Sequence, residues 1–128
     1  MLIGHYGIAF ALKKYDKSLN LGFLFIAAML MDIAFSFFIL LGIEHMRIVP
    51  GFTESNSLDL YDIPFSHSLL GSIILAISTF LIVRYLFLKN SDKTEAEKSR
   101  TALILGSAVI FHYVLDICHW NSAKVVGI

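Results

Sequence analysis

The chain has 128 residues, of which 57% are hydrophobic and 16% are charged, and its formal net charge at pH 7 is zero. Soluble domains average about 45–50% apolar and about 25% charged residues, so this composition indicates an integral membrane protein. The balanced charge argues against a nucleic-acid partner, and a single cysteine, Cys118, excludes an internal disulfide.

Residues 1–12, MLIGHYGIAFAL, form an apolar segment that is too short to cross a bilayer. As a helix it would measure about 18 Å, whereas a hydrocarbon core is about 30 Å thick. We therefore expect it to enter the membrane partway or to pack against the other helices. It has no Asp, Glu, Lys or Arg, and His5 is its one histidine.

Residues 21–43 are long and apolar enough for a first span, with Asp32 in the middle. A polar connection, residues 44–64, follows, and the charged residues at its start, beginning with Glu44, are interpreted as a structural cluster beside the membrane. Near its end, Asp62 stands two residues before a proline. This pattern is typical of a helix start, where a carboxylate caps free N–H groups.

Residues 65–88 form the second predicted span, which opens with His67 between two serines. This places the imidazole at a membrane boundary. Small residues recur every four positions along the same span, and such a stripe allows another helix to pack closely. They are Ser68, Ser72 and Ala76.

Residues 100–120 form the third span and carry two histidines and one aspartate near its far end. His112 and Asp116 stand four residues apart and therefore lie on one helix face, with His119 close to the same stripe. Such groups are costly in hydrocarbon, so they normally pair, hold an ion or face a protein interior. The alternative is a polar contact that joins helices. For His119, the neighbouring tryptophan also fits an interfacial aromatic belt.

Basic residues predict the orientation of the spans. If the three spans alternate in direction, eight of the ten lysines and arginines fall on one side, which the positive-inside rule makes cytoplasmic. Residues 44–64 then face outward. These eight are Lys13, Lys14, Lys17, Arg84, Lys89, Lys93, Lys98 and Arg100.

Counting about 1.5 Å per residue from the cytoplasmic ends brings ionisable groups of four segments to the outer half of one bundle. Imidazole and carboxylate together suit Zn²⁺, with Mn²⁺ or Fe²⁺ as alternatives, and a set without thiolate is typical of a catalytic site. Five groups exceed what one ion needs. Either some orient the ligands or two metals share the carboxylates. The five are His5, Asp32, His67, His112 and Asp116.

These pieces carry a family resemblance. The chain resembles the LexA-regulated, inner-membrane-associated metal-dependent hydrolases, a bacterial group more distantly similar to zinc-dependent phospholipases C. The resemblance implies metal-ligand roles for the five residues. It rests on Gly4-His5, the aspartate of MLMDI, FSHSLL from Phe65, and HYVLD from His112 to Asp116.

The chain departs from this family's pattern at two positions. Ala34 stands where a second aspartate is usual, which weakens the case for two metals. Asp62 stands where the family has a histidine, and it can serve as a ligand, a base or only a helix cap. Asp62 and His119 are the candidates for acid/base catalysis.

The sequence thus predicts one all-α membrane-embedded domain, residues 1–128, with three transmembrane helices and a short N-terminal helix. We expect a bacterial inner-membrane protein whose site faces the extracytoplasmic side, with membrane lipid and a second copy of the chain as candidate partners. The expected activity is hydrolysis of a lipid-like or phosphoester substrate through a metal-bound water. A non-enzymatic ion or proton pathway, or an interaction subunit, is the alternative.

Overall fold

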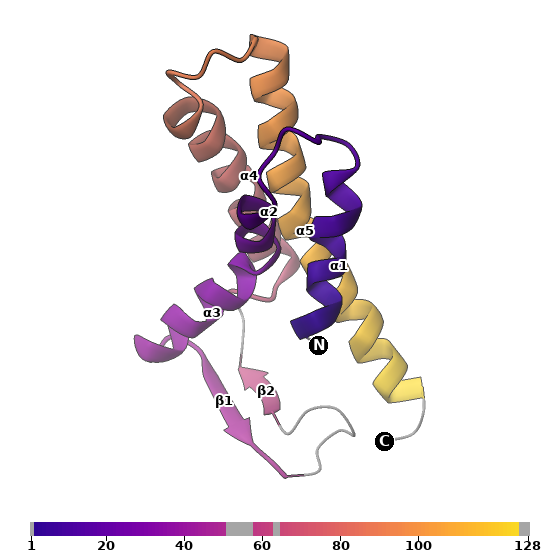
Figure 1. Cartoon of the computed structure of the whole chain (residues 1–128). Coiled ribbons are helices and arrows are strands. Elements are labelled where there is room, and N and C mark those ends of the chain that lie inside the picture. The colour runs from indigo at the N-terminus through magenta and orange to yellow at the C-terminus, as the bar shows by residue number, and fades with distance from the viewer. Residues whose placement is uncertain (1, 51–57, 63–64, 126–128) are drawn as a thin grey trace.

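The computed structural model describes residues 2–50, 58–62 and 65–125, and the side chains of residues 4–50 and 65–118. The described residues form a mostly helical structure with one strand pair (Figure 1). Its elements are α1 (Leu2–Lys13), α2 (Leu21–Ala28), α3 (Leu30–Leu40), β1 (His45–Ile48), β2 (Leu58–Asp62), α4 (Leu69–Ile82), the π-helical turn η1 (Val83–Phe87) and α5 (Glu95–Val125).

Two helices are long and apolar enough to cross a membrane. They are the continuous Leu69–Phe87 helix, made of α4 and η1, and Glu95–Cys118 within α5. The pair α2 and α3 passes the same test only when counted together, and the two are bent by 48°. The described chain therefore holds two such helices, or up to three if the bent pair is one span.

The predicted span over residues 21–43 is not one continuous helix, because the helix breaks at Met29. No glycine or proline marks this break in the sequence. At the break, the carbonyl of Ala28, the last residue of α2, accepts a hydrogen bond from His112 Nδ1 at 2.6 Å. A carbonyl at a helix end has no helical partner, so a tertiary contact can use it.

The connection after α3 also differs from the prediction of an all-α fold. β1 pairs with β2 in antiparallel register, with His45 opposite Asp62 and Ile48 opposite Leu58. Asp62 is the last residue of β2, and α4 begins seven residues later, at Leu69. Ser68 is the N-cap of α4, and its side chain accepts a hydrogen bond from the Gly71 N–H at 2.9 Å.

The short α1 packs against α2 and α5, as expected for a helix that cannot span the bilayer alone. Ala9, Leu24 and Ala108 of these three helices are fully buried in the shared core. Because Ala9 and Ala108 have small side chains, the helix backbones can approach closely. This packing brings His5 of α1 beside the second half of α5.

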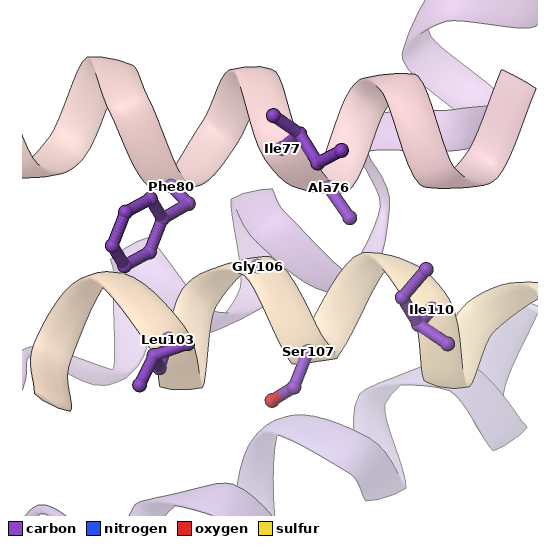
Figure 2. A pocket seen from close by; sticks show the side chains of 7 residues that line it. All are labelled: Ala76, Ile77, Phe80, Leu103, Gly106, Ser107 and Ile110. Carbon is purple, nitrogen blue, oxygen red and sulfur yellow. The ribbon is translucent and has the colours of Figure 1, made fainter. Parts of the chain in front are cut away.

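Small residues also line the contact between α4 and α5. A Cβ on Gly106 would lie 3.1 Å from the carbonyl oxygen of Ala76, so glycine permits this close approach. Ser72, from the same predicted stripe as Ala76, is fully buried. Figure 2 shows the apolar pocket beside this contact, which Phe80 of α4 and Leu103 of α5 both line.

The loop between α1 and α2 and the loop between η1 and α5 both carry lysines, and they meet at the end of the bundle opposite the strands (Figure 1). Asp16 is only 3% exposed and accepts hydrogen bonds from Ser18 Oγ at 2.6 Å, Ser18 N at 3.0 Å and Thr101 Oγ1 at 3.0 Å. Lys93 Nζ donates to Ser18 Oγ at 3.3 Å. Burial alone would raise the pKa of Asp16, but these hydrogen bonds and the Lys93 charge lower it below its usual value.

We expect Asp16→Asn to lower the free energy of unfolding by about 1–3 kcal/mol at neutral pH, because an amide turns one acceptor into a donor facing hydroxyl groups. The folded-state pKa lies below the unfolded value of about 3.9, so the Asp16 contribution is present above about pH 4 and is lost as the pH falls through the folded pKa. Thermal unfolding in detergent at pH 7 and pH 3 tests this. A parent–variant difference that grows towards pH 3 would contradict it.

Candidate metal centre

Five side chains from four segments converge at one place in the bundle. Counting the rise per residue along each predicted helix indicates that these groups lie together. His5 comes from α1, Asp32 from the first turn of α3, and His67 from the turn just before α4. His112 and Asp116 lie one helical turn apart on α5. The α2–α3 break directs Asp32 towards α5, because the chain changes direction three residues before it.

Four of these residues form a ring in which nitrogen and oxygen atoms alternate. His67 Nε2 lies 3.4 Å from Asp32 Oδ1 and 3.4 Å from Asp116 Oδ2. His112 Nε2 lies 3.5 Å from Asp32 Oδ1 and 3.2 Å from Asp116 Oδ2. Two ligand atoms that share one ion at about 2.1 Å lie roughly 3.0–3.4 Å apart. The ring therefore has the spacing of a ligand set that surrounds a single ion.

The Nδ1 atoms of His67 and His112 both have polar partners, which leaves their Nε2 atoms to face the ring. His112 Nδ1 contacts the Ala28 carbonyl, which can only accept, so Nδ1 carries a hydrogen. His67 Nδ1 lies 3.0 Å from the hydroxyl of Ser66. A metal-binding histidine usually has its second nitrogen held in this way by a carbonyl or another polar group.

Two buried atoms at the centre lack hydrogen-bond partners among the described residues. They are His112 Nε2 and Asp116 Oδ2. They lie 3.2 Å apart, yet their alignment makes no hydrogen bond. A buried polar atom without a partner is costly, and a shared cation satisfies a nitrogen and an oxygen lone pair at once.

His5 extends the cluster on the other side of Asp116. Its Nε2 lies 3.0 Å from Asp116 Oδ1, the oxygen that does not belong to the ring. Its ring stacks on that of His112 with centroids 3.9 Å apart. The atoms of His5, His112 and Asp116 form one group that can hold a metal, and those of Asp32, His67 and His112 form a second. Within each group the atoms lie within 4.8 Å of one another.

The site is closed on the imidazole side and open on the carboxylate side. The His112 side chain is fully buried, whereas 37% of the Asp32 side chain and 29% of the Asp116 side chain are exposed. A ligand can therefore reach the carboxylates. The side chains of the predicted acid/base candidates, Asp62 and His119, lie outside the described part of the structure, so their roles stay predictions.

Two residues near the site were not among the predicted ones. Glu44 is 1% exposed and binds the segment that carries Ser66 and His67. Its position after a predicted span gave no sign of this contact, which joins residues 22 apart. Gly71 is the second, because a Cβ there would lie 1.7 Å from the carbonyl oxygen of Phe65. The segment before α4 can fold over the helix only if this residue is glycine.

Comparison of the chain with family models, curated proteins and solved structures found no match. The class is therefore defined by the fold and the site. This is a mostly helical protein with two to three helices able to span a membrane and a buried His/Asp cluster able to hold a metal ion.

We expect Gly71→Ala to displace His67 from the ring, because the added methyl group would overlap the Phe65 carbonyl. A misplaced ligand should weaken metal binding roughly tenfold or more, measured by zinc titration of the detergent-purified protein.

Gly7→Ala is the matched control, since a Cβ at Gly7 meets nothing within 4 Å. Gly7 also lies in a helix, where alanine is favoured over glycine by roughly 0.5–1 kcal/mol. Equal zinc affinity in Gly71→Ala and Gly7→Ala protein would show that the segment before α4 does not position the site.

Proposed function

We propose that the protein is a membrane-embedded metal-dependent hydrolase that binds one divalent ion in the ring of His67, His112, Asp32 and Asp116. The observation that carries the proposal is the pair of unpartnered buried atoms, His112 Nε2 and Asp116 Oδ2, on a ring with 3.2–3.5 Å edges. A single ion meets the needs of all four ring atoms.

Charge supports a cation in preference to a neutral polar contact between helices. The carboxylates of Asp32 and Asp116 are partly buried, and each lies 3.4 Å from the same atom, His67 Nε2. Two negative charges so close together repel strongly in a low dielectric. A divalent ion cancels both charges. Protonated histidines could also cancel them, but they would direct N–H groups at the carboxylates, and His112 Nε2 makes no such hydrogen bond.

The donor set favours Zn²⁺, with Mn²⁺ or Fe²⁺ as alternatives, because imidazole and carboxylate without thiolate suit these ions. When bound, such an ion supplies a Lewis acid that lowers the pKa of a water molecule and polarises a phosphoryl or acyl oxygen. The remaining roles belong to the chain. His67 and His112 would bind the ion through Nε2, Asp32 and Asp116 would bind it through Oδ1 and Oδ2 respectively, and His5 Nε2 can hold a proton against Asp116 Oδ1.

A lipid-like or phosphoester substrate fits the location of the site. The ring lies between apolar helices, and its open side is the carboxylate side, which a headgroup can approach from the membrane boundary. The motifs that resemble LexA-regulated membrane hydrolases support the same class, since FSHSLL and HYVLD provide His67, His112 and Asp116.

An ion or proton pathway is the second candidate, because it would use the same residues. It requires polar groups through both halves of the bilayer. In the described helices, residues 69–83 and residues 101–111 contain no ionisable side chain. This favours a site at one depth over a path.

The first test is the metal content of detergent-purified protein. We expect near-stoichiometric zinc, manganese or iron in the parent and its loss in a His112→Ala, Asp116→Ala double variant, because two of four ring ligands are removed. His45→Ala is the matched control for histidine removal, since His45 lies on β1 and belongs to neither metal group. It should retain the metal.

Metal binding then justifies a hydrolysis assay with phospholipid and phosphoester substrates, in which the double variant should be inactive. Metal-free parent protein, even after reloading with each ion, would overturn the proposal. Bound metal without hydrolysis of any of these substrates would contradict the hydrolase assignment and leave a metal-binding membrane protein.

A further inference from the structure

Glu44 is a buried carboxylate whose two oxygens make different contacts with one segment. Its Oε1 accepts the backbone N–H of Phe65 at 2.8 Å and that of Ser66 at 2.7 Å. Its Oε2 accepts the hydroxyl hydrogen of Ser66 at 2.6 Å. The first pair of bonds holds the backbone before α4, and the third bond orients a side chain.

The number of hydrogens on Ser66 determines what it can do for His67. A serine hydroxyl carries one hydrogen, and Ser66 donates it to Glu44. Ser66 Oγ then has only lone pairs for His67 Nδ1, which lies 3.0 Å away. Nδ1 must therefore be the donor, and a neutral His67 carries its lone pair on Nε2, the atom that faces the two carboxylates at 3.4 Å.

We infer that Glu44 is a positioning residue that acts through Ser66 to hold His67 in the tautomer with its hydrogen on Nδ1 and a metal-binding lone pair on Nε2. The effect on metal affinity rests on the proposed function. The tautomer itself is a property of the protein without metal, so it can be tested separately.

The same result is reached at His112 by a simpler device. There the Ala28 carbonyl accepts directly from Nδ1, and a carbonyl can never donate. A hydroxyl can both donate and accept, so Ser66 alone would leave the His67 tautomer undetermined. Glu44 removes this freedom because a carboxylate that accepts at both oxygens is acceptor-only. Both ring histidines thus present Nε2 to the same centre.

A purely structural role for Glu44 would need only Oε1. That oxygen receives both backbone N–H groups, and the carbonyl oxygen of glutamine can replace it without a change in shape. Oε2 serves only the Ser66 hydroxyl. Glu44→Gln therefore separates the two roles: its oxygen keeps the backbone bonds, and its NH₂ group must donate to Ser66 Oγ. The hydroxyl then turns to donate to Nδ1, and the ring hydrogen moves to Nε2.

The test is nuclear magnetic resonance of ¹⁵N-histidine-labelled, metal-free protein in detergent between pH 7 and 9, with the His67 signal assigned by its loss in His67→Gln protein. We expect the Nδ1–H tautomer in the parent and the Nε2–H tautomer in Glu44→Gln. Zinc titration of the same proteins should show roughly 10–100-fold weaker binding in Glu44→Gln, the usual effect of losing a partner of a metal-binding histidine.

Asp16→Asn is the matched control, because Asp16 is a second buried carboxylate that accepts one backbone N–H and two hydroxyl groups, but at the basic end of the bundle. It should change neither the His67 tautomer nor the zinc affinity. Ser66→Thr retains a hydroxyl and should keep both values, whereas Ser66→Ala should weaken zinc binding. In the Ser66→Ala background, Glu44→Gln should have no further effect on affinity.

An unchanged His67 tautomer in Glu44→Gln, or the Nε2–H tautomer in the parent, would overturn the inference. If Glu44→Gln does not fold, the Ser66 pair decides, since both variants leave the backbone bonds of Glu44 in place: equal zinc affinity in Ser66→Thr and Ser66→Ala would overturn it. A parent without zinc but with the expected tautomer change would remove the proposed function and keep the inference. Bound zinc with no tautomer change would keep the proposed metal site and overturn the inference about Glu44.

Discussion

The cost of placing two carboxylates and three imidazoles among apolar helices is the constraint on which the rest of the structure depends. None of these groups is stable in such surroundings without partners. They therefore share one centre, where Asp32 meets two imidazoles and Asp116 meets three, at 3.0–3.5 Å. Four segments have to meet at the same depth for this to happen, and the packing of α1 on α2 and α5 brings His5 there.

Irregular backbone is found where the chain serves this centre. The break at Met29 frees the Ala28 carbonyl for His112 and starts a new helix whose first turn carries Asp32. Non-helical backbone is tolerated at membrane depth when its polar groups are satisfied inside the protein. The bend is thus linked to the site, since one contact both satisfies the helix end and sets the imidazole tautomer.

The segment before α4 shows how a glycine and a buried carboxylate together position one ligand. Gly71 leaves room for the Phe65 carbonyl, Ser68 caps the helix, and Glu44 accepts the backbone N–H groups of Phe65 and Ser66. His67 is therefore held from outside the helix, by contacts with the chain that follows α3. β1 begins at His45, directly after Glu44, so the connection between α3 and α4 contributes to the positioning of the site.

The sequence by itself determined the apolar segments that are long enough to cross a membrane and the group of His and Asp residues, because composition, segment length and helical periodicity are local properties. The spacing of His112 and Asp116 predicted a shared face, and basic residues predicted which ends lie together. Only the tertiary structure decided the break at Met29, the strand pair, the start of α4 at Ser68 and the role of Glu44. Each depends on contacts between residues far apart in the chain, such as Ala28 with His112 and Glu44 with Ser66, and no local pattern encodes these partners.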